Sequence, residues 1–514
     1  MDPISIKNIS FAYSDILPVM MTIVNKCFSE GIFPTSEKKA VVKPLLKKVG
    51  LDEEVFKNYR PVSNLSFLSK VIEKAILMQL LPFFKKKGVI PKFQSAYREA
   101  HSTESALCRI HNDLIENVCS ALISLLILLD LSAAFDTIDH ELFLQDISGM
   151  GVTGVVLELL RSYLVGRLQS VIVEGNQSEF SGVKFGVPQG SILGPILFIV
   201  YINSLSHIMS SHGVDFHVYA DDTQIYIPVK DLATTKEKLL SLLSDIKIWM
   251  CQRKLMLNEG KTEIILIKGS LHSDLDLNFG SLSFGSTELK LSNSVKNIGV
   301  FFDAKLSFET HIDNIVKVCN FQIRNLYFIR KHLTKENLIE LVHAFIISKI
   351  DYCNILFIGL PKKQLKKLQK IQNRAVRLIC SLNPWDHVTP SLIALHWLPI
   401  KARIEYKVCL MVFKVLKLKQ PEYLLDLLQP ASNNLDISLR SEDDSLRLQE
   451  PRAVMNKLFG ERSFKYSAPR FYNSLPITLR KSESVDIFKK NLKTFIFQKA
   501  FDFDNETISP DYAV

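Results

Sequence analysis

The stretch HVYADDTQIYI (residues 217–227) decides the fold, because two short apolar runs flank the acidic pair Asp221 and Asp222. Each run is long enough for a short strand, and the acidic pair fits a tight hairpin turn. Upstream, the apolar run 125–129 ends in Asp130. It has no polar alternation, which is typical of a strand buried on both faces. The pattern therefore predicts carboxylates at the ends of buried strands.

Carboxylates held close together in a low dielectric repel one another and raise one another's pKa values, so such a group needs a cation. Oxygen ligands with open positions suit Mg²⁺, and two such ions about 3.5–4 Å apart can clamp both oxygens of an in-line phosphoryl displacement. A plainer interpretation is that Asp130 caps a helix beginning near Thr137 and that Asp221 and Asp222 only form a turn. Either motif alone leaves both interpretations open.

Three blocks taken together favour the metal site. They are LDLSAAFD (129–136), GVPQGSILGP (186–195) and YADD (219–222), in the order and at the spacing of motifs A, B and C of reverse transcriptases. The AFD ending and the PQGS block resemble the enzymes of non-LTR (LINE-class, jockey-like) retrotransposons rather than the retroviral ones.

This resemblance implies that Asp130 and Asp221 bind two Mg²⁺ ions, with Mn²⁺ as a substitute, and that Asp222 is a weaker third ligand. The residues themselves do not rank Asp221 against Asp222, because adjacent strand residues face opposite ways.

Further motif residues would shape the nucleotide site. The resemblance places Phe135 under the incoming sugar, where a bulky ring would reject a 2′-hydroxyl and select deoxynucleotides; a plain core phenylalanine is the alternative. Gln189 and Gly190 would pack against the nascent base pair, or they only form a turn. Lys261, within LNEGKTE, matches the lysine thought to protonate the departing pyrophosphate; a solvated surface lysine is the alternative. Arg60, within NYRPVS, would hold nucleotide phosphates bidentately.

Three smaller features belong to the same region. Lys47 or Lys48 could add point charges beside the nucleotide. FQSAYR (93–98) resembles the next fingers motif, but Ser-Ala stands where many relatives have Ser-Gly, a mild change unless that backbone needs a positive φ. NIGVFFD (297–303) resembles motif E, the hairpin that holds the primer end, with isoleucine in place of the commoner leucine.

The segment 361–380 is strongly basic, contains no acid and has an apolar stripe at helical spacing. We expect a thumb helix whose cations follow the phosphates of an RNA–DNA hybrid; a solvated helix face is the alternative. Its basic residues are Lys362, Lys363, Lys366, Lys367, Lys370, Arg374 and Arg377.

Composition limits the class of protein. The 514 residues are 47% hydrophobic, which predicts several folded cores, and the net charge of +10 favours a polyanionic partner. Eight cysteines stand apart without zinc-ligand spacing, so we expect reduced intracellular thiols. The start has no basic region followed by an apolar one, and the longest apolar runs, around 121–129 and 196–202, are too short to cross a bilayer. We therefore expect a protein of the nucleus or cytoplasm, neither secreted nor membrane-bound. His387 and His396, in segments that resemble the post-polymerase region of LINEs, are expected to be structural.

The fold class expected is α+β, a right-hand polymerase with fingers, an antiparallel palm sheet backed by helices, a helical thumb and a mostly helical carboxyl-terminal extension. The expected boundaries are 1–40 for a helical extension, 41–270 for fingers and palm, 271–425 for primer grip and thumb, and 426–514 for the last part. Within these, we expect a helix over 17–33, a strand over 40–46, a helix over 67–84 and a polar stretch over 431–445.

The expected function is RNA-directed DNA synthesis on an RNA template from a DNA primer and dNTPs. A catalytically silent or repurposed remnant that binds RNA or hybrid is the alternative, and a host DNA-templated polymerase is a third interpretation. No endonuclease is recognisable in the sequence, so we expect that another protein supplies target nicking.

Overall fold

A computed structural model of the chain describes residues 9, 11–120, 122–132, 135–268, 282–284, 287–431, 446–451 and 460–501. Ala133 and Ala134 of the first motif lie outside the described residues, as does all of the expected polar stretch except Ala431.

The palm is a four-stranded antiparallel sheet with the strand order β11-β3-β9-β8. In β3, Leu126 packs on one face in a core shared with helix α4, whereas Leu125, Ile127 and Leu129 pack on the other face in a core shared with α7, α8 and α9. Burial on both faces explains why this run has no polar alternation, and the expected strand is confirmed. The palm elements are β3 (Ile123–Leu129), β8 (Asp215–Tyr219), β9 (Asp222–Val229), β11 (Glu263–Ile267), α4 (Thr103–Cys119), α7 (Gly194–Tyr201), α8 (Leu205–Ser211) and α9 (Leu232–Gln252).

The fingers are built on a second sheet in which β1 pairs antiparallel with β2 and parallel with β5, and β6 and β7 both pair with β5. The expected helices over 17–33 and 67–84 and the strand over 40–46 are confirmed, with ends shifted by a few residues. The elements are α2 (Tyr13–Glu30), η1 (Thr35–Lys38), β1 (Lys39–Leu46), η2 (Phe56–Asn58), β2 (Tyr59–Asn64), α3 (Phe67–Lys87), α5 (His140–Gly149), α6 (Val155–Leu164), β5 (Arg167–Val173), β6 (Asn176–Gln177) and β7 (Ser181–Val183).

Short strands and hairpins connect the palm to the thumb. Strands β14 and β15 form an antiparallel hairpin directly before the first thumb helix. The connecting elements are β4 (Leu131–Ser132), β10 (Met256–Leu257), η3 (Glu259–Lys261), β12 (Leu282–Phe284), β13 (Thr287–Leu289), β14 (Ser294–Asn297) and β15 (Val300–Asp303).

The rest of the described chain is helical, and its helices share one apolar core with α4 and one face of the palm sheet. The helix expected over the basic segment is confirmed as α13, and its contact with nucleic acid stays a prediction. The elements are α10 (Glu309–Ile329), η4 (Arg330–His332), α11 (Lys335–Val342), η5 (His343–Ile347), α12 (Ser348–Asp351), η6 (Asn354–Phe357), α13 (Lys362–Cys380), α14 (Thr389–Ala394), α15 (Ile400–Leu418), α16 (Glu422–Leu425), α19 (Phe464–Asn473), α20 (Ile477–Arg480) and α21 (Val485–Phe501).

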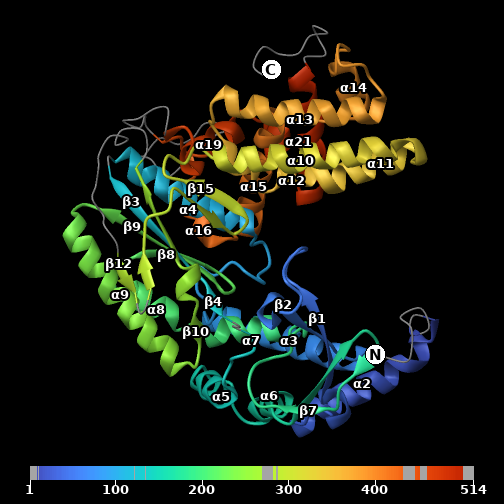
Figure 1. Cartoon of the computed structure of the whole chain (residues 1–514), viewed down its shortest axis with the longest axis vertical. Coiled ribbons are helices and arrows are strands. Elements are labelled where there is room, and N and C mark those ends of the chain that lie inside the picture. Colours follow the sequence, from blue (N-terminus) through green and yellow to red (C-terminus); the bar gives the residue numbers. More distant parts are fainter. Residues whose placement is uncertain are drawn as a thin grey trace.

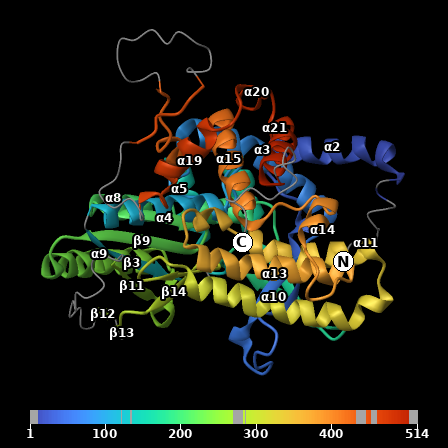
Figure 2. The ribbon, with the colours of Figure 1, turned by 90° about the horizontal axis from the view of Figure 1, so that it is seen from above.

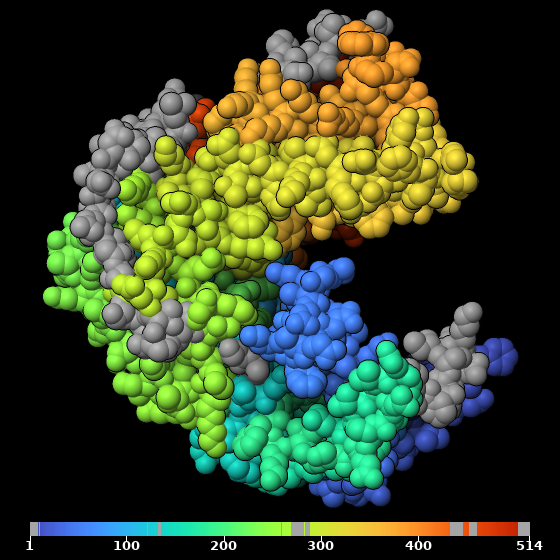
Figure 3. Space-filling model, in the orientation of Figure 1, coloured from blue at the N-terminus to red at the C-terminus, as the bar shows by residue number. Residues whose placement is uncertain are grey.

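The three parts enclose an open cleft. Figure 1 shows the helical part above, the palm sheet at the side and the fingers below. In the space-filling view, the cleft opens between the thumb surface and the fingers (Figure 3). Helix α10 borders the cleft, and α13 lies beside it on the side away from the fingers (Figures 1 and 2). The expected right-hand architecture of mixed helices and antiparallel sheet is thus confirmed.

Candidate active site

The three predicted carboxylates lie at neighbouring strand ends of the palm. Asp130 follows β3, and Asp221 and Asp222 lie where β8 turns into β9, which is hydrogen-bonded to β3. The turn holds only Ala220 and Asp221, since Tyr219 pairs with Asp222 in the ladder. The helix-cap alternative for Asp130 is wrong, because the next helix, α5, begins at His140 and is capped by Asp139. Asp221 does lie in a hairpin turn, as the plainer interpretation expected. Its place in a turn does not decide whether its carboxylate binds a metal ion.

The three carboxylates lie close enough together for their charges to shift one another's pKa values. Desolvation raises the pKa of Asp222 to about 6, and repulsion from Asp221 and Asp130 adds to the shift. Desolvation also raises the pKa of Asp221, and there Asp130 adds to the shift while Arg60 and Lys261 oppose it. A buried carboxylate next to like charges favours its neutral form until a cation neutralises the group.

Lys261 supplies part of the missing positive charge. Its Nζ donates to Oδ2 of Asp130 at 3.0 Å, and it reaches the carboxylate from η3. Directly before η3, the backbone N–H of Asn258 donates to the Asp130 carbonyl at 2.9 Å. The Lys261 side chain is 65% exposed, so the pair is open to solvent and can be exchanged. The structure thus places this predicted lysine in contact with the first carboxylate.

The donor set fits a hard divalent cation. Asp130, Asp221 and Asp222 offer only oxygen ligands, and their mutual repulsion is what such an ion would relieve. In the part of the chain that the structure describes, no group of three or more His, Cys, Asp or Glu side chains is gathered closely enough to hold a metal ion. Instead, the Asp130 carboxylate accepts a hydrogen bond from Lys261.

A cavity of about 430 Å³ adjoins the carboxylates. Asp130, Asp222 and Lys261 line it, together with Lys48 from the fingers and Lys296 from β14. Of the two predicted fingers lysines, Lys48 therefore lies at the site, whereas Lys47 donates to the Lys57 carbonyl at 2.7 Å and closes the fingers hairpin. Sequence reasoning missed Lys296, because it lies outside the residues of the motifs.

Arg60 lies at the far end of the fingers hairpin, where it pairs with Leu45 across the ladder. Its side chain is exposed, and its charge is close enough to Asp221 to oppose the rise in the pKa of that carboxyl. The β1–β2 hairpin therefore carries this predicted phosphate ligand toward the palm carboxylates.

The motif B loop is fastened to both fingers and palm. Gln189 donates from Nε2 to both oxygens of Asp136, at 3.0 and 2.9 Å, and its carbonyl accepts the Ser63 N–H of β2 at 2.7 Å. Gly190 has φ +118°, and a Cβ there would lie 2.7 Å from the Ser63 carbonyl oxygen. Only glycine fits so close to β2 in that conformation.

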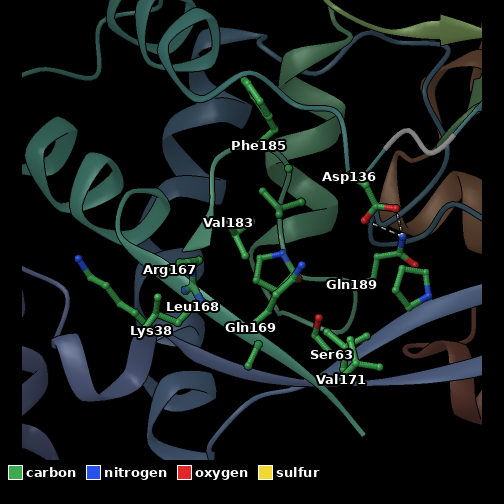
Figure 4. Close-up of a pocket in the computed structure, with 16 residues that line it drawn as sticks. Lys38, Ser63, Asp136, Arg167, Leu168, Gln169, Val171, Val183, Phe185 and Gln189 are labelled. Carbon is green, nitrogen blue, oxygen red and sulfur yellow. Dashed lines mark hydrogen bonds between the residues drawn. The ribbon is translucent and has the colours of Figure 1, made fainter. Parts of the chain in front are cut away.

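A pocket of about 250 Å³ lies beside this loop, between it and the fingers sheet. Figure 4 shows Gln189 joined to Asp136 on one side of the pocket, with Ser63 below and Arg167 and Leu168 of β5 on the other side. The buried Arg167 guanidinium carbon lies 4.2 Å from the ring centroid of Tyr163, so its charge faces an aromatic ring of α6.

Phe135 is half-buried, and its ring stacks on Phe198 of α7 with the centroids 4.9 Å apart. The ring therefore packs partly in the core, as the plainer interpretation expected, and its role beside the incoming sugar stays a prediction. The Val187 N–H donates to the Phe135 carbonyl at 2.9 Å, which fixes the start of the motif B loop against this residue.

The motif E hairpin has a tight turn at Ile298 and Gly299, with φ of +40° and +85°. Positive φ at both central residues is the type I′ geometry that suits hairpins, although it strains a β-branched residue. Tyr352, which directly follows α12, donates from its hydroxyl to the Ile298 carbonyl at 2.7 Å. Sequence reasoning missed Tyr352, because it lies 54 residues away in a segment without a motif.

The basic residues of α13 divide into two groups. Lys362, Lys363, Lys366 and Lys370 are exposed. Lys367 is bonded to Asp313 and Glu309 of α10 at 2.6 and 3.4 Å, Arg374 to Asn320 at 2.7 Å, and Arg377 to the Asp386 carbonyl at 3.2 Å. Part of the predicted cationic face therefore holds α13 against α10.

Helix α10 carries a face that sequence reasoning missed. Lys317, Phe321, Arg324 and Phe328 recur at helical spacing, all are exposed, and Arg324 lies 6.0 Å over the Phe328 ring. A signal was present, since residues 314–335 contain five Lys or Arg and no acid.

The two histidines that were predicted to be structural lie beyond α13. His396 packs on Phe497 of α21, with ring centroids 5.4 Å apart, as a structural role requires. His387 is exposed beside the buried Val388, so its side chain takes little part in the core.

An antiparallel palm with carboxylates at its central strand ends, a fingers hairpin bearing an arginine and a helical thumb together define a polymerase of the right-hand class. Residues 46–302, half of the chain, match the family model for reverse transcriptase (RNA-dependent DNA polymerase), and the chain belongs to this family.

Curated relatives narrow the comparison. The chain is 27% identical over 380 residues to the RNA-directed DNA polymerase from mobile element jockey of Drosophila melanogaster, covering 72% of this chain and 40% of the relative. It is 24% identical to the jockey polymerase of Drosophila funebris (71% and 40% covered) and 25% identical to a probable RNA-directed DNA polymerase from transposon BS of Drosophila melanogaster (73% and 42%). The expected resemblance to jockey-like non-LTR elements is confirmed, and the chain spans about 40% of the length of these relatives.

Among solved structures, apo telomerase from Candida tropicalis matches with a TM-score of 0.39 and 12% identity, covering 80% of this chain and 74% of that chain. Such a score is too low for a comparison of individual residues. None of the helices in the described residues is both long enough and apolar enough to cross a membrane.

Proposed function

We propose that the chain is an RNA-directed DNA polymerase that joins dNTPs to a primer 3′-hydroxyl on an RNA template. The observation that carries the proposal is the gathering of Asp130, Asp221 and Asp222, whose charges raise the pKa values of Asp221 and Asp222 while Lys261 and Arg60 oppose the rise. It is found in a chain whose residues 46–302 match the reverse transcriptase family. The relatives are named as polymerases of this kind.

The three carboxylates would hold two Mg²⁺ ions, or Mn²⁺ in their place. When bound, these ions would supply activation of the primer hydroxyl and stabilisation of the charge that develops on the phosphate. The protein's own share is to place three oxygen donors at adjoining strand ends, from which the side chains would turn toward the ions as Lys261 leaves Asp130.

Two cations would act on the phosphates. Arg60 lies on the fingers side of Asp221, where its fork can bind two phosphate oxygens of the dNTP. Lys261 would exchange its Asp130 partner for the pyrophosphate and donate a proton from Nζ to a pyrophosphate oxygen as it leaves. The exposure of the Lys261 side chain permits that exchange.

Sugar and base selection would fall to Phe135, Gln189 and Gly190. The Phe135 ring is braced by Phe198, so a 2′-hydroxyl would meet a ring that cannot easily withdraw. The close approach of Gly190 to the Ser63 carbonyl would hold the motif B loop against β2, where Gln189 would face the template–dNTP base pair. Asp136 holds the Gln189 amide so that its position is set before a nucleotide arrives.

The RNA–DNA hybrid would be held by the thumb. The exposed cations of α10 and the four exposed lysines of α13 would contact its phosphates, and Phe321 and Phe328 would add apolar contacts with sugars. Synthesis would take place in the nucleus or cytoplasm.

The test is primer extension on poly(rA)/oligo(dT) with Mg²⁺. The wild type should incorporate dTTP, and Asp130→Ala and Asp221→Ala should each lower the rate by at least about 10²–10³-fold. Asp15→Ala, on the exposed surface of α2, is the matched control and should keep the wild-type rate. Hybrid binding without incorporation by the wild type would refute the enzyme and favour a silent remnant. A strong preference for poly(dA) as template would favour a DNA-templated polymerase.

A further inference from the structure

The segment 93–96 runs along the edge of the palm sheet, next to β8. The Val218 N–H donates to the Phe93 carbonyl at 2.9 Å, and the Ser95 N–H donates to the Val218 carbonyl at 3.0 Å. These bonds form a parallel bridge between Gln94 and Val218. The segment thus covers the edge strand that leads into the Ala220–Asp221 turn.

Gln94 reaches from this segment to the turn. Its side chain is 2% exposed, and its Oε1 accepts hydrogen bonds from the Ala96 N–H at 2.9 Å and from the Ala220 N–H at 3.2 Å. Through this amide oxygen, a residue 126 positions upstream contacts the residue immediately before Asp221.

The turn needs such an acceptor because of its backbone. Ala220 has φ +56° at the first position of a two-residue hairpin turn, where glycine is the usual residue. The residue is also only 5% exposed, so water does not satisfy its N–H. A buried N–H without a partner is more costly than an ordinary hydrogen bond is favourable. The Gln94 oxygen therefore removes a penalty that would otherwise favour another conformation of the turn.

The segment that carries Gln94 is itself held firmly. The Ser95 hydroxyl bonds to His217 Nε2 at 2.7 Å and to the Tyr423 hydroxyl at 2.8 Å, and all three side chains are buried. The left-handed backbone conformation falls at Tyr97 (φ 56°) and not at Ala96, so alanine in place of the commoner glycine is indeed a mild change. The neighbouring Ser95 thus anchors Gln94 to the sheet and to α16.

We propose that Gln94 is a positioning residue that holds the Ala220–Asp221 turn in its strained conformation and so sets the place of the Asp221 carboxylate. The effect on synthesis rests on the proposed polymerase function, whereas the effect on the turn does not.

The experiment measures amide hydrogen exchange in the full chain, resolved at Ala220, beside steady-state kinetics. In the wild type, the Ala220 amide should exchange at least about 100-fold more slowly than in an unfolded chain. Gln94→Met keeps size and burial but removes the acceptor, and it should raise exchange at Ala220 at least about tenfold while the amides of β3 and α4 keep their protection. Gln364→Met, a buried glutamine of α13, is the matched control and should leave exchange at Ala220 unchanged.

The kinetic readout separates positioning from general damage. A displaced Asp221 should lower kcat by about tenfold or more, with the KM for dNTP within about twofold, because the change acts on the reacting groups and not on nucleotide contacts. Unprotected exchange at Ala220 in the wild type would overturn the proposal even if Gln94→Met fails to fold. So would unchanged exchange at Ala220 in the variant, or an equal rise across β3 and α4. A wild type without synthesis would refute the polymerase, while the exchange comparison would still decide the role of Gln94.

Discussion

The charge of the Asp222 carboxyl should change with pH within the range in which such a protein works. Its pKa is raised to about 6, so it is neutral below that pH and charged above it. Because Mg²⁺ competes with this proton, Mg²⁺ affinity should strengthen as pH rises through 6 and weaken by up to about tenfold per unit below it. Calorimetric titration of the nucleic-acid-free protein between about pH 5 and 7 measures this.

Asp222→Asn is the variant that isolates this proton. It should bind Mg²⁺ more weakly above pH 6 and with a flatter dependence on pH, since the titrating group is gone. A dependence as steep as that of the wild type would show that another group carries the effect.

Gly190 lies in close contact with the fingers, because a Cβ there would meet the Ser63 carbonyl. Gly190→Ala should lower the free energy of unfolding by about 1–3 kcal/mol, because the new Cβ meets the Ser63 carbonyl in a backbone conformation that alanine avoids. Chemical denaturation measures this loss, and dNTP incorporation should fall with it. Gly182→Ala in β7 is the matched control, since a Cβ there meets nothing within 4 Å. Equal losses in both variants would contradict the role of the close approach.

At the residue scale, sequence reasoning predicted which side chains gather and missed what each one touches. The meeting of Asp130 with the YADD turn followed from strand ends and motif order. The bonds from Lys261 to Asp130 and from Gln189 to Asp136 join segments 131 and 53 residues apart, so they depend on tertiary register that no local pattern encodes. The same holds for Gln94 and Ala220.

The motif E hairpin depends on a single hydroxyl from another element. Tyr352→Phe should weaken primer–template affinity by about 3–10-fold, the worth of one hydrogen bond, because the strained Ile298 carbonyl would be without its donor. Equilibrium binding of oligo(dT) on poly(rA) measures it. Tyr13→Phe on α2 is the control for loss of a tyrosine hydroxyl, and a fall in affinity in that variant as large as in Tyr352→Phe would argue against a local effect.

At the element scale, short apolar runs located β3, β8 and β9, a long apolar segment located α3, and helical periodicity located α13. It did not distinguish the roles of α10 and α13. The density of charge drew attention to α13, but two of its cations bond to α10. Charge density in a sequence does not tell whether a lysine meets solvent or a neighbouring helix, which is a property of packing.

The exposed face of α10 should therefore carry a share of hybrid binding. Replacing Lys317 and Arg324 by Gln should lower the slope of log K against log salt by up to about 0.7–0.9 for each phosphate that the protein no longer neutralises. Fluorescence anisotropy of a labelled hybrid at several salt concentrations measures the slope. Lys26→Gln on α2 is the control, and an unchanged slope in the α10 double variant would leave binding to α13 alone.

At the scale of the whole molecule, the last helices share the core of the thumb. Phe488 of α21 is fully buried and stacks on Phe413 of α15, with the ring centroids 3.9 Å apart. Phe488→Ala should cost about 3–5 kcal/mol of stability, whereas Ile487→Ala, at an exposed neighbour, should cost little. Chemical denaturation followed by probes on α21 and on the thumb helices measures this. Separate transitions for α21 and the thumb would contradict a shared core and support the predicted boundary at 426.

One hydrogen bond and one close approach between Ser63 and the motif B loop also bear on how this hand can move. The Ser63 N–H bonds to the Gln189 carbonyl and the Ser63 carbonyl faces Gly190, so the base of the fingers hairpin is joined to the motif B loop at that point. A closing movement over a nucleotide that keeps these contacts would be a bend of the hairpin beyond Ser63, with Arg60 moving toward the palm. The hinge of this hand would lie within a pair of strands, and its amplitude would be limited by the few residues between Ser63 and the hairpin tip.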